Sequence, residues 1–216
     1  TTLFRSYGGG YCRFKTMKGI ILLNGEPYYK AINAENAVVY CCDGAYAWAK
    51  GRIKIDKNIG DFDSLNQTPY PPPEEIYPAE KDFTDGEIAL IKMLLEGVDE
   101  IEFYGFGGGR EDHFLGNLQL LYRAYSAGVK CRAYTEKSVM FPAGGKILFG
   151  EYKNKTVSVL PFGGSLNIID SEGLKYAYPD RIGYGECRGL SNIVLSEKAY
   201  LKVDGCALVI INIYPV

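Results

Sequence analysis

The sequence predicts an α/β protein of two domains, an N-terminal domain with a mainly parallel sheet and a C-terminal all-β sandwich domain. From residue 17 to about residue 141, short apolar runs alternate with helical patterns, which is typical of βαβ units. After that point the helical periodicity ends, and short apolar runs alternate with Gly, Asn, Asp and Ser turns. We therefore expect domains at 17–142 and 143–216, with the boundary in the PAGG segment at 142–145.

The N-terminal domain is expected to be Rossmann-like, because its predicted strands and helices follow one another along the chain. The predicted strands are 19–23, 37–42 and 101–104, and the predicted helices are 45–50, 84–96 and 111–126. The proline-rich segment 66–73 is incompatible with a central strand or a helix, so we expect a loop there.

Apolar periodicity predicts which faces of the two longer helices are buried. For the helix at 84–96 the predicted apolar stripe is Ile88, Ile91, Leu94 and Leu95. Thr84 with Glu87 three residues later predicts a capping box at the start of this helix. For the helix at 111–126 the predicted buried face is Phe114, Leu118, Leu121 and Tyr125.

The C-terminal domain shows only short strand patterns separated by turns. They are 156–161, 166–169, 174–178, 193–196, 199–203 and 207–213. We interpret this part of the chain as a binding or dimerising module rather than a separate enzyme domain.

Composition indicates an ordinary soluble globular protein of 216 residues, with 47% hydrophobic and 23% charged residues. The net charge of −2 makes nucleic acid an unexpected partner. No apolar run has the length of a membrane span, and no signal peptide is visible, so no membrane partner is expected. The six cysteines have no C-x-x-C spacing, which favours reduced thiols in a cytoplasmic protein.

The first sixteen residues differ from the rest, because they lack clear periodicity. Met17 opens a strand and turn pattern directly afterwards. We expect Met17 to be the natural start and residues 1–16 to be a leader or an added extension.

Two acidic clusters follow strand-like segments. The first contains Asp61 and Asp63, and the second contains Asp82 and Asp85. Two bare carboxylates about 4 Å apart repel by roughly 4 kcal/mol at a surface-like dielectric, so a shared cation would explain the clustering. Oxygen-only ligands favour Mg²⁺ over zinc. The alternatives are that these acidic turns are only solvated, or that Asp82, Thr84 and Asp85 only cap a helix.

A glycine-rich segment at 107–113 lies between a predicted strand and a predicted helix. Such glycines let backbone N–H groups approach an anion, and Arg110 can donate two hydrogen bonds to a phosphate. The segment is neither a Walker A loop nor a dinucleotide-binding fingerprint. His113 and Asn117 lie one helical turn apart. The alternative is that His113 is only a surface histidine in a helix cap. The prediction of a phosphate site therefore depends on the whole cluster and not on His113.

Asp43 ends a predicted buried strand and is followed by glycine. Asp-Gly is ordinary turn chemistry, which is the structural interpretation. Ligands collect at the carboxyl ends of strands in open α/β sheets, so Asp43 is also a secondary candidate for a substrate contact.

These motifs together resemble the thiamine pyrophosphokinase (thiamine diphosphokinase) family, bacterial type. They occur in the family's order from residue 17 onwards, and six ordered motifs are more specific than any one of them. The motifs are NGEP (24–27), CDGA (42–45), GDFDS (60–64), KDFTDGEIAL (81–90), GFGGGREDHFLGN (105–117) and GLSN (189–192).

The resemblance implies transfer of pyrophosphate from ATP to the hydroxyl of thiamine, giving thiamine diphosphate and AMP, with Mg²⁺ required. It also implies a homodimer with the active sites between subunits. The implied ligands of Mg²⁺ and the phosphates are Asp61, Asp63, Asp82 and Asp85. The implied lining of the ATP site is Thr84, Arg110, Asp112, His113 and Asn117. The implied thiamine contacts are Ser191 and Asn192, in the partner's cleft.

One departure concerns the aromatic group that packs on thiamine. The animal enzymes place a tryptophan near thiamine in the C-terminal domain, and this chain has none there. Tyr184 and Tyr214 are the candidates in its place. Two other functions remain open from the residues, an Mg²⁺-dependent nucleotide phosphohydrolase and a non-catalytic sensor of thiamine or nucleotide.

Overall fold

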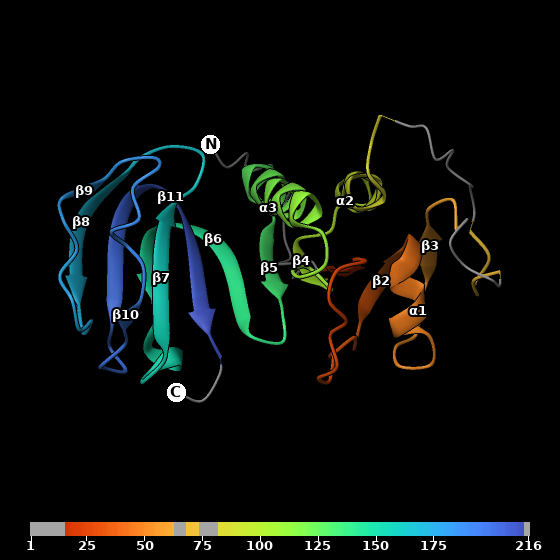
Figure 1. Ribbon diagram of the computed structural model, residues 1–216, viewed down its shortest axis with the longest axis horizontal. Helices are drawn as coiled ribbons and strands as arrows, with labels where there is room; N and C mark the ends of the chain where they lie inside the picture. The colour runs from red at the N-terminus through yellow and green to blue at the C-terminus, as the bar shows by residue number, and fades with distance from the viewer. Residues whose placement is uncertain (1–15, 63–67, 74–81, 214–216) are drawn as a thin grey trace, which may run out of the picture.

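The computed structural model describes residues 16–62, 68–73 and 82–213. Three residues of the sequence motifs, Asp63, Ser64 and Lys81, lie outside the described residues, as do Tyr214 and nearly all of the expected leader. Within the described residues the predicted class is confirmed, because a parallel sheet with helices is followed by an antiparallel β region (Figure 1).

The N-terminal part is a five-stranded parallel sheet in the order β5-β4-β1-β2-β3. Its strands are β1 (Lys18–Leu22), β2 (Ala37–Cys42), β3 (Lys57–Ile59), β4 (Glu100–Tyr104) and β5 (Lys130–Tyr134). The chain runs from β1 to β3 in one direction and then resumes with β4 on the other side of β1. This reversal leaves a switch point between β1 and β4, where ligands bind in sheets of this kind.

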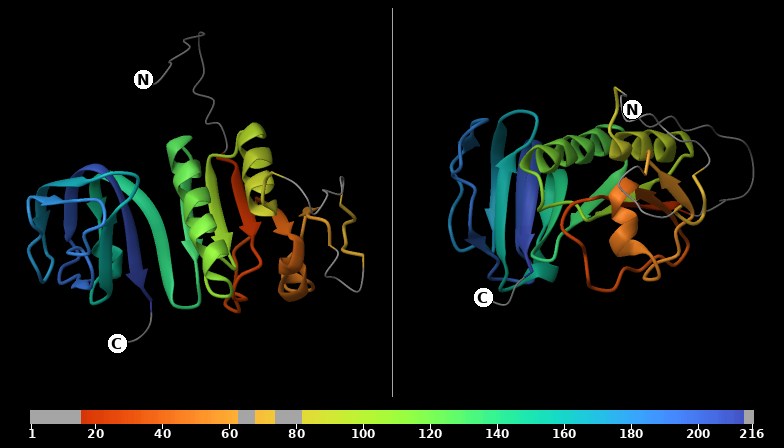
Figure 2. Two further views of the ribbon diagram at one scale, coloured as in Figure 1. Left: turned by 45° about the horizontal axis from the view of Figure 1, so that its top comes forward. Right: turned by 45° about the vertical axis from the view of Figure 1, so that its right-hand side comes forward.

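Helices cover both faces of the parallel sheet (Figure 2). Helices α2 (Asp85–Leu95) and α3 (Glu111–Ser126) pack on one face, against side chains such as Ile21 and Leu23. The short segment η1 (Asp43–Ala45) leads into α1 (Tyr46–Ala49), which packs on the other face. Alternate residues of the central strands therefore fill two separate cores, as expected for a sheet buried on both sides.

The predicted apolar stripe of α2 is wrong at its end, because the Leu95 side chain is 83% exposed. Ile88 and Leu94 are partly buried against the core, but the fully buried positions are Gly86, Ala89, Leu90 and Met93. A Cβ on Gly86 would lie 2.9 Å from both Leu120 and Leu23. Small residues let α2 approach α3 and the sheet closely, so its buried face is rotated from the one that the large apolar residues predict.

The capping box at the start of α2 is only half formed. The Thr84 hydroxyl accepts a hydrogen bond from the Glu87 N–H at 3.2 Å, as predicted. The Glu87 side chain instead pairs with Arg123 on α3. In α3, Leu121 is buried as predicted, and the partly buried remainder of its predicted face packs on the same core.

The C-terminal part is antiparallel. Its elements are β6 (Ser138–Leu148), η2 (Gly150–Tyr152), β7 (Thr156–Pro161), β8 (Leu166–Glu172), β9 (Arg181–Ile182), β10 (Asn192–Ile193) and β11 (Tyr200–Asn212). One edge of β11 pairs with β6 along its length, and the other pairs first with β8 and then with β7. This change of partner folds the strands around a second core, which includes Phe149, Val159 and Leu201.

Several strand predictions in this part are wrong. The segments 199–203 and 207–213 form the single strand β11, with a register shift between Val203 and Ala207. The segment 174–178 contributes only a bridge from Leu174 to Val194. Strand β6 runs through the PAGG segment and pairs with β5, so the hydrogen-bonded sheet is continuous across the expected domain boundary. Within the described residues, no helix has the length and apolar character needed to cross a membrane.

A hydrogen-bonded group at the end of α2 links the helix to the sheet. Tyr40 Oη donates to Glu96 Oε1 at 2.5 Å, and Lys57 Nζ donates to the same oxygen at 3.0 Å. Partial burial alone would raise the pKa of Glu96, but the hydrogen bonds from Tyr40 and Lys57 lower that pKa below its ordinary value. Burial and the bond to Glu96 raise the pKa of Tyr40 to about 12.

We expect Glu96→Gln to lower the free energy of unfolding by at most about 1 kcal/mol near neutral pH, because the Glu96 side chain is 36% exposed and solvent screens the pair. A carboxyl whose pKa is lowered by folding stabilises the protein above its unfolded pKa, and this contribution is lost as pH falls through the folded pKa. The difference in the free energy of unfolding between the wild type and Glu96→Gln should therefore become smaller at acidic pH. Denaturant unfolding at about pH 7 and about pH 3 measures it, and an equal difference at both pH values would contradict the assignment.

Candidate active site

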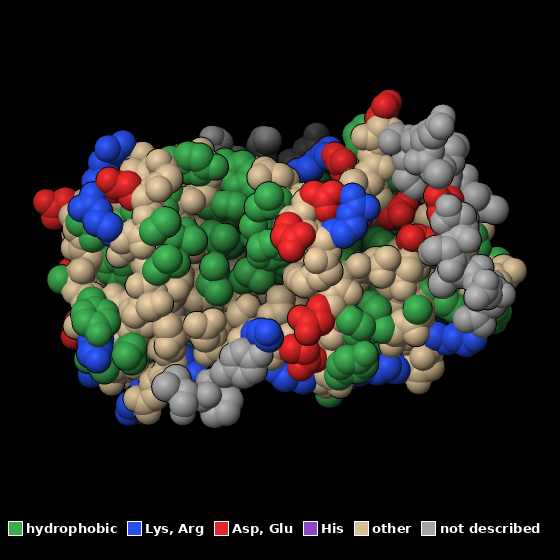
Figure 3. Space-filling model, in the orientation of Figure 1, with side chains coloured by type: hydrophobic (Ala, Val, Ile, Leu, Met, Phe, Trp, Pro, Cys, Tyr) green, Lys and Arg blue, Asp and Glu red, His purple; other side chains and the backbone are tan. Residues whose placement is uncertain are grey.

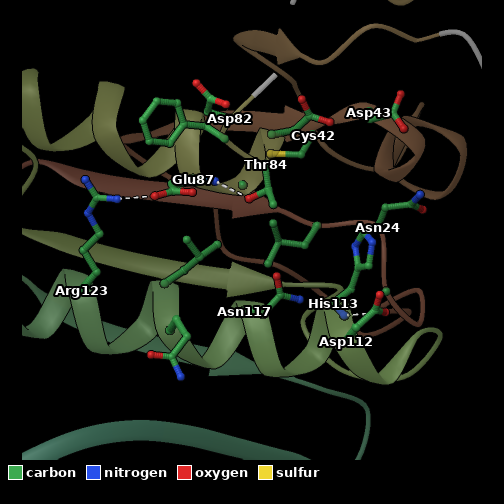
Figure 4. A pocket seen from close by; sticks show the side chains of 18 of the residues that line it. Asn24, Cys42, Asp43, Asp82, Thr84, Glu87, Asp112, His113, Asn117 and Arg123 are labelled. Carbon is green, nitrogen blue, oxygen red and sulfur yellow. Dashed lines mark hydrogen bonds and ion pairs between the residues drawn. The ribbon is translucent and has the colours of Figure 1, made fainter. Parts of the chain in front are cut away.

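A cavity of about 640 Å³ opens at the carboxyl ends of the parallel strands, between the start of α2 and one face of α3 (Figure 4). The segments after β1, β2, β3 and β4 all contribute to its lining, through Asn24, Asp43, Asp61 and Gly108 respectively. The cavity thus occupies the switch point of the sheet, where a ligand can reach turns from four strands at once.

Carboxylates from four segments line this cavity, one of them Asp112 at the start of α3. Asp43 follows β2, Asp61 follows β3, and Asp82 and Asp85 lie at the start of α2. Figure 4 places Asp43 and Asp82 along the same side of the cavity. Asp63 lies outside the described residues. The structure therefore brings Asp61, Asp82 and Asp85 to one cavity rather than to separate patches of surface.

The carboxylate oxygens in this lining are ligands of the kind that Mg²⁺ prefers. Among the residues described, no group of three or more His, Cys, Asp and Glu side chains is close enough to enclose a metal ion by itself. Protein sites for Mg²⁺ commonly use one or two carboxylates, and substrate phosphates and water supply the other ligands.

The backbone of the GDFDS motif is shaped by its glycine. Gly60 has φ +149°, and a Cβ there would lie 3.0 Å from Asp43 Cβ. Asp43 itself has φ +40°, an uncommon conformation for a residue other than glycine. Gly60 thus allows the ends of β2 and β3 to approach each other, which places Asp43 and Asp61 in one cavity.

The NGEP and GFGGG motifs bind each other through their backbones. The Gly25 N–H donates to Gly105 O at 2.9 Å, and the Glu26 N–H donates to Gly107 O at 2.7 Å. A Cβ on Gly25 would lie 2.5 Å from Gly105 O, so only glycine allows this approach. Asn117 Nδ2 on α3 donates to Phe106 O at 2.8 Å. The predicted ATP-site residue Asn117 therefore lines the cavity and also fixes the glycine-rich segment.

The start of α3 contains a local ion pair. Arg110 donates from Nε and Nη2 to the two carboxylate oxygens of Asp112, at 3.1 and 2.6 Å, and the His113 N–H also donates to Asp112 at 2.9 Å. The hydrogen bonds from Arg110 hold the pKa of Asp112 below its ordinary value. Asp112 and His113 line the cavity, whereas the Arg110 side chain is 73% exposed and is not part of the lining.

Sequence reasoning missed several lining residues. The most informative are Asn24, Cys42, Gln119 and Arg123. Asn24 follows β1 as Asp43 follows β2, so the same carboxyl-end argument could have found it. Gln119 and Arg123 lie at i+7 and i+11 from Asp112, which places all three on one face of α3. Helical spacing from the predicted site would have indicated both.

The predicted thiamine contacts lie elsewhere in the chain. Asn192 begins β10 and Ser191 directly precedes it, in the antiparallel part of the molecule away from α2 (Figure 1), and neither residue lines the cavity. Asn192 is buried, and its amide bonds to the backbone N–H and C=O of Tyr176 at 3.0 and 2.8 Å. Ser191 is exposed with φ +59°. Tyr184 is also exposed in this region.

Both parts of the chain match family models. The catalytic domain of thiamin pyrophosphokinase matches residues 29–133, and the vitamin B1 binding domain of thiamin pyrophosphokinase matches residues 146–206. A relative from Bacillus subtilis, thiamine pyrophosphokinase, is 35% identical over 163 residues, which cover 71% of this chain and 76% of the relative. The chain belongs to the thiamine pyrophosphokinase family.

Solved structures with the same fold come from bacteria and fungi. The thiamine pyrophosphokinase of Bacillus subtilis matches with a TM-score of 0.78 and 22% identity, covering 93% of this chain and 100% of that chain. The yeast thiamin pyrophosphokinase matches with a TM-score of 0.70 and 16% identity, covering 93% of this chain and 87% of that chain. At these identities the likeness concerns the fold.

The expected activity, thiamine pyrophosphokinase, is therefore confirmed at the level of the family, which uses ATP. The family assignment favours this transferase over the phosphohydrolase and sensor alternatives. The described carboxylates of the cavity fall within the catalytic-domain match, and Ser191 and Asn192 fall within the vitamin B1 binding match. The domain limits 17–142 and 143–216 remain predictions.

Proposed function

We propose that the cavity between α2 and α3 is the site at which pyrophosphate passes from Mg²⁺-bound ATP to thiamine. The observation that carries this proposal is the convergence of Asp43, Asp61, Asp82 and Asp85 with the glycine-rich segment in one cavity at the switch point. Asp63, which belongs to the same motif as Asp61, is included in the proposed metal-binding set. Carboxylates on one side and backbone N–H groups on the other suit a polyphosphate that carries a metal ion.

The residues of this chain bind and orient the nucleotide. The start of α3, with Asp112, His113 and Asn117, and the cap residue Thr84 face the cavity from two helices. Arg110 exchanges its exposed partner Asp112 for a phosphate group of the nucleotide. Two phosphate oxygens then accept the two hydrogen bonds that the Asp112 carboxylate accepts in this structure. The bound Mg²⁺ offsets charge on the phosphate oxygens.

In the proposed reaction the thiamine hydroxyl oxygen forms a bond to the β-phosphorus of ATP, and the bond from that phosphorus to the bridging oxygen of AMP breaks. AMP leaves with the electron pair of that bond, and an aspartate accepts the hydroxyl proton. The two candidates for this base are Asp63 and Asp85. Asp85 lines the cavity at the first turn of α2, which supports it as a candidate.

Thiamine binding is proposed to involve the C-terminal module of a second chain. Within one chain, β7, β11, β6 and β5 separate β10 from the strands that border the cavity, so a homodimer with the active site between subunits would bring Ser191 to the partner's cavity. Hydrophobic side chains gather on the surface over β7, β11 and α3 (Figure 3). Leu115 of α3 is exposed, and Tyr122 of α3 contacts Phe162, which follows β7. This apolar face is the proposed dimer contact.

In this arrangement Asn192 acts as a positioning residue, because its amide holds the turn through Tyr176, while Ser191 presents its hydroxyl to thiamine. Tyr184, which is exposed, is the proposed aromatic group next to thiamine. Mixing an Asp61→Asn chain with a Ser191→Arg chain tests the shared site. Activity should return on mixing, since one site of each mixed dimer has both wild-type parts, and no recovery in a confirmed mixed dimer would contradict it.

The test of the proposed function is to incubate the protein with ATP, Mg²⁺ and thiamine and to quantify thiamine diphosphate and AMP. Both products should form in equal amounts, only when thiamine is present, and chelation of Mg²⁺ should stop their formation. Phosphate release without thiamine would instead indicate a phosphohydrolase. Binding of ATP and thiamine without any product would indicate a sensor.

A further inference from the structure

The chain between the GDFDS and KDFTD motifs is attached to the protein outside the cavity. Asp61 of the first motif and Asp82 of the second both line the cavity, on the side of the sheet that α2 and α3 cover. The described segment 68–73 between them is hydrogen-bonded instead on the side where α1 packs. The two acidic motifs therefore meet on one side of the sheet, while the segment that connects them is held on the other side.

Asn58 on β3 makes the first bond to this segment. Its neighbour Ile59 belongs to the core under α2 and α3, so Asn58 points to the opposite face of β3, which is the edge strand of the parallel sheet (Figure 1). Asn58 is 3% exposed, and its Nδ2 donates to Pro71 O at 2.7 Å. Its Oδ1 is buried and has no hydrogen-bond partner in the part of the chain that the structure describes. Folding alone would favour an apolar residue there, because a buried amide with an unbonded oxygen is costly.

Tyr46 at the start of α1 makes the second bond. Its side chain is buried in the core on the α1 side, and its hydroxyl accepts a hydrogen bond from the Tyr70 N–H at 3.0 Å. The Tyr70 side chain is 81% exposed, so its ring does not anchor the segment and its backbone N–H does. We call Asn58 and Tyr46 together the tether. Neither residue lines the cavity.

The turn that contains Asp61 has a backbone conformation that needs support. Phe62, directly after Asp61, has φ +56° and is 8% exposed. This left-handed conformation is unfavourable for a bulky residue and persists only where the surrounding structure maintains it. Strand β3 fixes the chain before this turn, and the tether fixes the chain after it. The tether therefore helps to keep Asp61 directed into the cavity.

We infer that Asn58 and Tyr46 are positioning residues for the proposed reaction, and that they set the affinity of the cavity for Mg²⁺ by holding the two acidic motifs together. This inference rests on the proposed function, since it takes the cavity carboxylates to bind Mg²⁺. Carboxylates that converge repel each other, so without the tether they move apart when no cation is bound. Mg²⁺ must then order the connecting chain as well as bind the carboxylates, and this entropy cost weakens its apparent affinity.

Tyr46→Phe and Asn58→Leu each remove one bond of the tether and keep a side chain of similar size. We expect each substitution to raise the Mg²⁺ concentration for half-maximal activity about threefold, and the double variant to raise it about tenfold, because each lost bond is an ordinary neutral hydrogen bond. At saturating Mg²⁺, kcat and the KM values for ATP and thiamine should equal those of the wild type. A purely structural role would change stability without this shift in the dependence on Mg²⁺.

Thermal unfolding measures the same effect without turnover. Mg²⁺ added with inorganic tripolyphosphate, in the absence of thiamine, should raise the Tm of the wild type, because a ligand that binds only the folded protein stabilises it. The double variant should need about tenfold more Mg²⁺ for half of this increase. Tyr40→Phe is the matched control, since it removes a buried tyrosine hydroxyl that donates to Glu96 at the other end of α2. It should lower the Tm without ligand and leave the dependence on Mg²⁺ unchanged.

The outcomes separate this inference from the proposed function. If the wild type forms thiamine diphosphate and the folded double variant keeps the wild-type dependence on Mg²⁺, the tether has no positioning role and the proposed function stands. A lower kcat or a higher KM for ATP at saturating Mg²⁺ would also overturn the inference, because the substitutions would then disturb the whole site. If Asn58→Leu does not fold, Tyr46→Phe alone decides, since it keeps the buried ring.

Two results for the wild type test the premise itself. If Mg²⁺ does not raise its Tm in the presence of tripolyphosphate, the cavity carboxylates do not bind the metal with phosphate, and the inference fails with that premise. If the wild type makes no product from ATP and thiamine, the proposed function itself fails.

Discussion

Replacing Asp61 by asparagine is expected to lower kcat by about 10²-fold or more while the protein stays folded, since one electrostatic stabiliser of the transferring group is lost. Asp61 follows β3 and lines the cavity together with Asp82 and Asp85, so its charge acts where the polyphosphate is proposed to lie. Asparagine keeps nearly the same shape but removes the negative charge that is proposed to bind Mg²⁺. The initial rate of thiamine diphosphate formation at saturating ATP and thiamine measures the loss.

The dependence on Mg²⁺ should change in the same variant. We expect Asp61→Asn to need a higher Mg²⁺ concentration for half-maximal activity, and Asp63→Asn to show a similar loss of kcat. Asp180→Asn is the matched control, because Asp180 is an exposed aspartate of the C-terminal part and is not in the cavity lining. Wild-type turnover and Mg²⁺ dependence in a folded Asp61→Asn protein would remove Asp61 from the proposed metal site.

The helices and strands that the sequence predicts well begin and end at residues whose local sequence indicates a boundary. The limits of β2 and α3 match their predicted ranges, and α2 lies one residue inside its prediction at each end. Thr84 is a capping residue, and Gly128 with φ +83° follows the end of α3. Such signals act within a few residues, so a single sequence contains them.

The elements that the sequence predicts poorly depend on distant partners. Strand β6 contains Pro142 and Gly145, which are turn residues by local chemistry, yet it is held by pairing with β11 some sixty residues later. The sequence likewise predicts the C-terminal half of β11 as a separate strand, because Asp204 and Gly205 are turn residues and lie within the register shift of β11. In both strands the tertiary pairing overrides the local turn signal.

The same distinction applies to the candidate site. Turn chemistry at the carboxyl ends of strands points to Asp43 and Asp61, because parallel strands end at one edge of the sheet. Arg123 is indicated only by its helical spacing from Asp112, and its pairing with Glu87 is not indicated at all, because that pair forms only when α2 packs on α3. The ion pair of Arg110 is local, in contrast, because its partner Asp112 is only two residues away in the sequence.

Replacing Gly105 by alanine is expected to lower the free energy of unfolding by about 3 kcal/mol or more, because the substitution combines backbone strain with a backbone clash. Gly105 has φ +65°, and a Cβ there would overlap Leu23 O, the oxygen that also accepts a hydrogen bond from Trp48 Nε1 at 3.3 Å. For a chain of this length such a loss corresponds to roughly 6–12 °C in Tm. The clash would separate the glycine-rich segment from β1, so activity should fall with stability.

Alanine substitutions at two other glycines distinguish the effect of backbone strain from the effect of a steric clash. Gly97 has φ +77° but no atom within 4 Å of a Cβ, so Gly97→Ala should cost only about 1 kcal/mol. Gly116 is inside α3 with open space around it, so Gly116→Ala should raise stability by about 0.5–1 kcal/mol through helix propensity. Thermal unfolding measures the stability of each variant, which should increase from Gly105→Ala to Gly97→Ala to Gly116→Ala. If Gly105→Ala loses no more stability than Gly97→Ala, then the segment after β4 moves away from Leu23 without penalty, and the close approach of the two motifs does not hold the cavity in place.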